Sequence, residues 1–232
     1  MKLRYHRALV KLSGELLAGP CGPLDAGGLS FCAREIRTAR DAGAKLAVVI
    51  GGGNVARGSA LPHLPPVAGH TIGMLGTLLN GVALREALAE EEVPSVLMSA
   101  LPCSGVADPV DAWRAREALD SSQVVLFAAG TGNPFVTTDT AAVIRALAVG
   151  AEAVLKGTNV DGIYESDPAK DPGAHLIPRL AHREYLARGL KVMDAAAVAI
   201  AGDHGLPILV FRADREGSLL SALRGEIGSL IA

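Results

Sequence analysis

Short runs of apolar residues alternate with helix-length segments along almost the whole of this 232-residue chain. The runs at 46–50, 95–99 and 124–129 are nearly continuous in apolar residues and show no strict apolar–polar alternation. Such runs are typical of strands buried on both faces, which occur in parallel sheets covered by crossover helices. The chain is therefore predicted to be an α/β protein, a three-layer αβα sandwich with a mostly parallel central sheet, in one domain spanning 1–232.

The positions of the individual elements follow from apolar periodicity and from Gly and Pro breaks. A glycine at a helix end, as at Gly43 and Gly150, indicates a C-cap. The loops are expected at 19–28 and 61–69, which are rich in Gly or Pro. Strands are predicted at 8–12, 46–50, 95–99, 124–129, 153–156 and 207–211, and helices at 30–42, 70–91, 111–119, 140–150, from Asp194 to about 204, and 217–223.

The composition restricts the function classes. Hydrophobic residues make up 50% of the chain and aromatic residues 3%, so the core must be aliphatic. A net charge of −2 with interspersed signs argues against a nucleic-acid surface or a polybasic membrane patch. Three cysteines without metal-type spacing indicate a reducing compartment. Lys11 and Glu15 interrupt the N-terminal apolar segment, so no signal peptide is expected.

Residues 58–84 contain no Asp, Glu, Lys or Arg. Three prolines and two histidines interrupt this stretch, so it lacks the ~20 continuous apolar residues that a membrane span needs. Within it, 72–84 is apolar on almost every side, which predicts a helix buried all round. That helix either meets a partner subunit or forms the centre of a monomer.

Glycine-rich turns follow several of the predicted strands. Lys11, 51–53 and 130–132 all lie at carboxyl ends of strands, where open parallel sheets bind their ligands. The stretch 130–139 joins a strand to a helix, and its glycines allow the backbone to approach a ligand closely. Its Thr and Asn side chains add hydrogen bonds, and Asp139 stands where a helix N-cap is expected. One crevice is therefore expected to collect these segments.

Familiar nucleotide motifs do not account for these turns. No Gly-Lys dipeptide exists, which excludes the P-loop. The spacing Gly51-x-Gly53-x-x-Ala56 matches a Rossmann fingerprint only weakly, because the acidic residue expected ~20 positions further on is missing. Neither a nucleophile elbow nor a zinc motif is present.

Two cations and two carboxylates accompany the turns. Lys11 and Arg57 are placed to neutralise phosphates, and Asp139 and Asp194 to serve Mg²⁺ or to orient the lysine. This set suits phosphoryl transfer between two polyanions, which depends on positioning and charge neutralisation. A phosphate acceptor is largely ionised at neutral pH, since its second pKa is about 6, so no general base is required. Taken singly, Lys11 at a strand end and Asp194 as a helix cap also fit purely structural roles.

Together these residues resemble the bacterial-type uridylate (UMP) kinases of the amino-acid kinase superfamily, over essentially the whole chain. The combination of Thr-Gly-Asn-Pro-Phe, Thr-Thr-Asp and Lys-Val-Met-Asp is the most specific part of the resemblance. The similar segments are 11–15, 51–54 with 57–58, 73–74, 80–81, 97–100, 130–135 with 137–139, 160–162 with 166–172, and 191–194.

The resemblance implies transfer of the γ-phosphoryl group of ATP to UMP, with Mg²⁺ accompanying ATP. It implies that Lys11, Arg57, Asp139 and Asp194 are catalytic, with the metal-binding acid left open. The implied ATP-binding residues are Lys11, Leu12, Ser13, Gly14, Gly53, Arg57, Thr158, Asn159, Tyr164 and Asp167. The implied UMP-binding residues are Gly52, His70, Thr131, Gly132, Asn133, Pro134, Phe135, Val136, Thr137 and Thr138.

The resemblance also implies a cytoplasmic homohexamer, a trimer of dimers packed through the helix at 72–84, with UTP and GTP as effectors. One position departs from the family. His70 stands where most members carry an Asp that binds the ribose hydroxyls, and a neutral imidazole accepts only one such hydrogen bond. This departure motivates an alternative function, a non-catalytic nucleotide or oxyanion-binding protein on the same fold.

Overall fold

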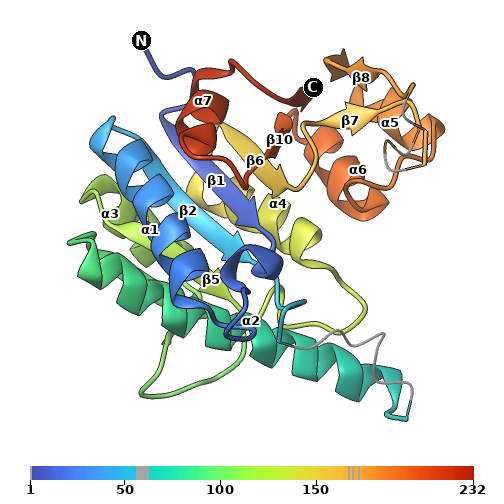
Figure 1. The fold of residues 1–232 in the computed structure, drawn as a ribbon. Coiled ribbons are helices and arrows are strands. Elements are labelled where there is room, and N and C mark those ends of the chain that lie inside the picture. The colour runs from blue at the N-terminus through green and yellow to red at the C-terminus, as the bar shows by residue number, and fades with distance from the viewer. Residues whose placement is uncertain (1, 56–62, 167, 169, 172) are drawn as a thin grey trace.

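A computed structural model describes residues 2–55, 63–166, 168, 170–171 and 173–232 (Figure 1). Its main sheet has nine strands in the order β4-β3-β5-β2-β1-β6-β10-β11-β9. The strands are β1 (Arg7–Leu12), β2 (Lys45–Ile50), β3 (Ser95–Ser99), β4 (Asp108–Pro109), β5 (Val124–Ala128), β6 (Ala153–Thr158), β9 (Arg179–Leu180), β10 (Ile208–Arg212) and β11 (Ser229–Ile231). Strands β7 (Ile163–Tyr164) and β8 (Leu176–Ile177) form a separate antiparallel pair.

The helices cover both faces of the sheet. They are α1 (Ala26–Asp41), α2 (Pro66–Glu90), α3 (Ala112–Asp120), α4 (Thr138–Val149), α5 (His182–Ala187), α6 (Ala195–Asp203) and α7 (Ser218–Arg224), with a 3₁₀ turn η1 (Gly14–Leu17). In Figure 1, α1 lies in front of the sheet and α4 behind it. The core divides accordingly, with α1, α2 and α7 packed on one face and α3, α4, α5 and α6 on the other. The predicted αβα sandwich is confirmed.

The sheet is mostly parallel, as expected. The seven strands from β4 to β10 pair in parallel, and only β11 runs antiparallel to its neighbour β10. Strand β1 is central, since Lys11 pairs in register with Val49 of β2 and with Lys156 of β6. Because successive side chains alternate between faces, Val10 and Leu12 join the core under α1 while Lys11 turns toward α4.

Two helices begin earlier than predicted, inside segments that were expected to be loop. Helix α1 starts at Ala26 because the Asp25 carboxylate accepts hydrogen bonds from the Gly27 and Gly28 amides, which outweighs the cost of two glycines in the first turn. Helix α2 starts at Pro66, since proline is well suited to the first helical position, where its missing N–H is not needed.

The prediction that Asp139 caps helix α4 is wrong. Thr137 is the N-cap, and its hydroxyl accepts hydrogen bonds from the Asp139 and Thr140 amides. Asp139 therefore lies inside the first turn, with its buried carboxylate directed at the sheet. The cap predicted at Asp194 is confirmed, as its carboxylate accepts a hydrogen bond from the Ala197 amide at 2.8 Å.

Helix α2 was expected to be buried all round, and within the described chain it is not. Leu84 and Leu88 are fully buried, while Val67, Leu75 and Leu79 are 51%, 43% and 53% exposed. This helix is long and apolar enough to cross a membrane, but one such helix is weak evidence because core helices pass the same test. Its inner side packs on α1, β3 and β5, and the described residues leave an apolar side with Val67, Leu75 and Leu79 uncovered.

Candidate active site

Two lysines and one aspartate form a buried charge cluster at the carboxyl ends of β1 and β6. Lys11 Nζ lies 3.3 Å from Asp139 Oδ1, and Lys156 Nζ is paired with Asp139 Oδ2. The three side chains are between 9% and 13% exposed. Since Lys11 and Lys156 are register partners on adjacent strands, both ammonium groups meet the first turn of α4 from the same face of the sheet. These three side chains together carry one net positive charge, and they lie at the carboxyl end of the sheet, where parallel sheets bind their ligands.

The environment shifts the titration of this cluster. Burial raises the pKa of Asp139, but the charges of Lys11 and Lys156 outweigh burial and hold the pKa below its usual range. Burial lowers the pKa of Lys156, with the nearby Lys11 charge acting in the same direction and Asp139 opposing it. A buried site with perturbed pKa values is a frequent mark of function.

Asp194 joins the cluster through α4 and α6. Its carboxylate accepts hydrogen bonds from the hydroxyls of Thr137 and Thr140, the latter at 2.9 Å. Its amide donates to Asp139 Oδ2 at 3.4 Å. Asp194 thus ties the N-termini of two helices together beside the lysines.

The glycine turns after β1 and β2 pack against each other. A Cβ added at Gly14 would lie 2.1 Å from Asn54 Oδ1 and 2.5 Å from the Gly51 carbonyl, so only glycine fits there. Asn54 and Asn80 exchange hydrogen bonds through their side-chain amides at 2.7 and 3.0 Å, and Asn80 also donates to Gly51 O at 2.7 Å. This network fixes both turns to α2. Ser13 caps η1 by accepting from the Glu15 amide, and the neighbouring Leu12 side chain is buried in the core.

A cavity of about 290 Å³ lies between the β2 turn, α2 and the turn after β5. It includes Gly52, His70, Thr131, Asn133, Val136 and Thr138 from the residues predicted to bind UMP, and Gly53 from the predicted ATP set. Among the described residues, Gly69, Gly73, Met74, Thr77 and Gly130 also line it. We call it the acceptor cavity. Thr138 lines the acceptor cavity and is followed in the chain by Asp139, so the cavity adjoins the lysine cluster.

The other residues of the predicted UMP set lie in the turn after β5, next to the residues that line the acceptor cavity. The side chains of Phe135 and Thr137 are exposed, and Gly132 and Pro134 are half-buried. The ring of Phe135, which is 66% exposed, meets the His70 ring edge-on, with centroids 4.7 Å apart. Phe135 has a φ of 65°, which is rare for a bulky residue and typical of a backbone held in place for function.

The residues predicted on the adenosine side follow β6. Thr158 ends this strand and donates to the Val160 carbonyl at 2.8 Å, while Asn159 is exposed. Tyr164 in β7 reaches Asp161 Oδ2 at 3.4 Å. Arg57 and Asp167 lie outside the described residues.

Sequence reasoning missed Lys156, although that residue is as deep in the charge cluster as Lys11. The signal was a lysine near the end of an otherwise apolar strand, where a solvated residue is rare. It also missed Thr140, whose hydroxyl holds Asp194.

Mg²⁺ is implied by the resemblance, and the described residues fit it only in part. In this part of the chain no three His, Cys, Asp or Glu side chains gather in a way that would hold a metal ion. The carboxylate of Asp139 is paired with two lysines, and that of Asp194 is occupied by Thr hydroxyls and a backbone amide. The described side chains therefore do not form a resident magnesium cage.

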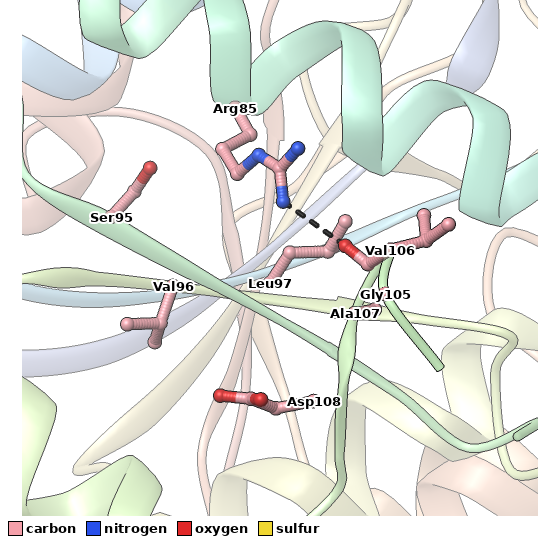
Figure 2. Close-up of a pocket in the computed structure, with 8 residues that line it drawn as sticks. All are labelled: Arg85, Ser95, Val96, Leu97, Gly105, Val106, Ala107 and Asp108. Atoms are coloured by element: carbon pink, nitrogen blue, oxygen red, sulfur yellow. Dashed lines mark hydrogen bonds between the residues drawn. The ribbon is translucent and has the colours of Figure 1, made fainter. Parts of the chain in front are cut away.

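A second cavity, of about 310 Å³, lies where α2 meets β3 and the loop before β4 (Figure 2). Arg85 and Asp108 both line this cavity. Arg85 projects from α2, and its Nη1 donates to the Val106 carbonyl at 3.0 Å. None of the described residues that were predicted to bind substrates belongs to its lining.

The fold and site define an α/β protein with a mostly parallel sheet, whose buried lysine–aspartate cluster adjoins a cavity of about 290 Å³. The model of the amino acid kinase family matches residues 6–212. The uridylate kinase of Pseudoalteromonas atlantica is 47% identical over 99% of this chain and 95% of its own length. That of Serratia proteamaculans is 46% identical over 98% and 96%.

Solved structures agree with these relatives. The UMP kinase from Bacillus anthracis has a TM-score of 0.94 at 35% identity, covering 98% of this chain and 96% of its own. The UMP kinase from Ureaplasma parvum has a TM-score of 0.91 at 31% identity, covering 99% and 100%. The chain therefore belongs to the amino acid kinase family and, within it, to the uridylate kinases.

Proposed function

We propose that this chain is a UMP kinase that transfers the γ-phosphoryl group of ATP to UMP, giving UDP and ADP. The single observation that carries the proposal is the Lys11–Asp139–Lys156 cluster beside the acceptor cavity. Two ammonium groups share the Asp139 carboxylate, and both can neutralise phosphate oxygens where the two substrates meet. The names of the full-length relatives support the same activity.

In this proposal an oxygen of the UMP phosphate attacks the γ-phosphorus, and the bond from that phosphorus to the β–γ bridging oxygen breaks. Lys11 and Lys156 neutralise the charge on the transferring group, while Asp139 fixes both ammonium positions. Asp194 holds the first turns of α4 and α6 in place. The acceptor needs no base, because its phosphate is already ionised, and catalysis rests on positioning and electrostatics.

The two substrates occupy opposite sides of the cluster. UMP fills the acceptor cavity, and its phosphate points toward Thr138 and the lysines. ATP lies along Ser13 and Gly14, with its adenosine toward Thr158 and Tyr164. Arg57 and Asp167, which lie outside the described residues, are assigned to ATP on the resemblance alone.

Mg²⁺ enters with ATP in this proposal. This ion commonly keeps several waters and binds substrate phosphates rather than an all-protein cage, which suits a site without a set of free carboxylates. When bound, it would add charge neutralisation to that of the lysines.

We further propose that residues 1–232 form one catalytic domain of a cytoplasmic homo-oligomer, a hexamer built from dimers, with UTP and GTP as effectors. The uncovered apolar side of α2 supports the dimer contact, because apolar residues exposed in a row on one helix commonly mark an interface.

A coupled assay for ADP release with ATP, Mg²⁺ and UMP tests the activity, with CMP and dUMP as comparison acceptors. The competing function is a nucleotide-binding protein without catalysis, motivated by His70. Calorimetry that shows UMP binding by folded protein, without turnover of any acceptor, would establish the competing function. The retained lysine pair argues against it, because binding alone does not require two buried cations beside the cavity.

A further inference from the structure

The turn after β5 adopts an unusual backbone conformation. Ala129 and Gly130 have φ of 59° and 57°, and Gly132 has φ of 82°. The left-handed region suits glycine, but for Ala129 it is strained, since its Cβ approaches the backbone. Ala129 is also fully buried, so its conformation must be imposed by neighbouring groups.

One neighbouring group is the hydroxyl of Thr77 on α2. The Ala129 amide donates to Thr77 Oγ1 at 2.6 Å, and that hydroxyl donates in turn to the Met74 carbonyl at 2.8 Å. Thr77 lines the acceptor cavity, but it is only 3% exposed and its hydroxyl is engaged by these two backbone groups, so water does not compete freely for this bond. A buried amide that loses its acceptor is costly, which makes this contact an effective constraint on the turn.

A second group constrains the next residue from the opposite side. Arg145 on α4 donates from Nη2 to the Gly130 carbonyl at 3.2 Å, and its guanidinium carbon lies 5.7 Å from the ring centroid of Phe127 in β5. The turn is thus held from α2 at its amide and from α4 at its carbonyl. Gly130 and Thr131, directly after these bonds, line the acceptor cavity.

We propose that Thr77 is a positioning residue for the acceptor nucleotide. Its hydroxyl holds Ala129 in the left-handed conformation and so sets where Gly130 and Thr131 lie in the acceptor cavity. The inference rests on the proposed function, because it takes that cavity as the UMP site. Without the hydroxyl the turn relaxes in the free protein, and UMP must restore it on binding.

The variants Thr77→Val and Thr77→Ser test this role. Valine keeps the shape and removes the acceptor, whereas serine keeps the hydroxyl. Thr71→Val is the matched control, because Thr71 lies on the same helix and its hydroxyl donates to the Val67 carbonyl within its own helix, at 2.9 Å. For each protein we would measure KM for UMP and for ATP, the Kd of UMP by calorimetry without ATP, and Tm.

We expect Thr77→Val to raise KM and Kd for UMP about tenfold, with KM for ATP changed by less than about twofold. Serine should restore the wild-type values, and Thr71→Val should match them. A lowered Tm with unchanged UMP affinity would show a purely structural threonine and overturn the proposal. Equal rises in both KM values, or a serine variant as impaired as the valine variant, would overturn it too.

Arg145→Leu keeps the proposal testable if Thr77→Val does not fold, since it releases the same turn from α4. It should raise KM for UMP selectively, and an unchanged KM would show that the turn needs no such support. A wild-type chain that binds UMP without phosphorylating it would contradict the proposed function alone. In that case the calorimetric comparison of the Thr77 variants would still decide the positioning role.

Discussion

Lys11 and Lys156 are register partners on neighbouring parallel strands, and both of their ammonium groups pair with the carboxylate of Asp139. Two like charges are thereby held close together at the buried carboxyl ends of two central strands, with the Asp139 carboxylate between them. In the proposed reaction these two ammonium groups neutralise phosphate charge, while the nearby Asp194 carboxylate is held by the Thr137 and Thr140 hydroxyls.

Replacing Lys156 with Met should lower kcat by about 10²–10³, the usual effect of removing one preorganised group that stabilises transition-state charge. Methionine fills a similar volume, so the fold should be retained, which circular dichroism would check. Lys45→Met is the control, because Lys45 pairs with the exposed Asp120 and surface pairs contribute only about 0–1 kcal/mol. A kcat for Lys156→Met within twofold of wild type would remove Lys156 from the mechanism.

Replacing Asp139 with Asn should destabilise the protein by about 3–5 kcal/mol in urea unfolding, because two buried ammonium groups lose their counter-charge. Asp120→Asn, at an exposed carboxylate that also pairs with two cations, should cost far less. Equal losses in the two variants would mean that burial of the charge cluster is unimportant.

The same carboxylate should make wild-type stability depend on acid pH. The folded pKa of Asp139 is held below its unfolded value, so the unfolded state binds more protons in this range and acid favours unfolding. Its stabilising contribution is complete above the unfolded value of about 3.9 and is lost as the pH falls through the lower folded pKa. Urea unfolding at several pH values should show this acid loss in wild type and a shallower one in Asp139→Asn.

Burial lowers the pKa of Lys156, so this ammonium should lose its proton at a lower pH than an ordinary lysine, whose pKa is about 10.4. The rate kcat should therefore fall at alkaline pH, before an ordinary lysine would titrate. Lys156→Arg keeps its charge throughout this range, so its alkaline limb should move to higher pH, whatever its absolute rate. An alkaline limb at the same pH in both proteins would assign the titration to another group.

His70 should weaken the discrimination between UMP and dUMP, which differ in the ribose 2′-hydroxyl. Replacing His70 with Asp introduces two acceptor oxygens in place of one nitrogen, and should raise the preference for UMP over dUMP about tenfold in kcat/KM. Assays with the two acceptors, in wild type and variant, measure the ratio directly. A ratio that does not change would show that His70 does not contact the ribose.

The uncovered side of α2 should mediate association. Replacing Leu79, which is 53% exposed, with Glu should reduce the assembly mass measured by light scattering, because burying an unpaired carboxylate at an interface is unfavourable. Leu176→Glu, at a 39% exposed leucine on β8, is the matched control. Unchanged mass in the Leu79 variant would reject α2 as the contact.

The sequence predicted much of this architecture because parallel strands buried on both faces leave an unmistakable apolar pattern. It placed β3 at its observed bounds and the other long strands within two residues of theirs. The short strands β4, β7, β8, β9 and β11 and the helix α5 were missed, because a few residues carry too little periodicity to be recognised. The helix starts were misplaced because Asp25 and Pro66 act through cap geometry, which outweighed the loop-like Gly and Pro content of those segments.

By itself, the sequence determined the fold class, the glycine turns at the strand ends, and the identity of Lys11, Asp139 and Asp194 as candidates. Those properties depend on local pattern and residue type. Only the tertiary structure decided that Lys156 lies opposite Lys11, that Asp139 serves both lysines rather than a helix cap, and that Thr77 reaches the Ala129 amide. Each of these contacts joins segments distant in sequence, and their approach is fixed by strand order and helix packing, which no local pattern encodes.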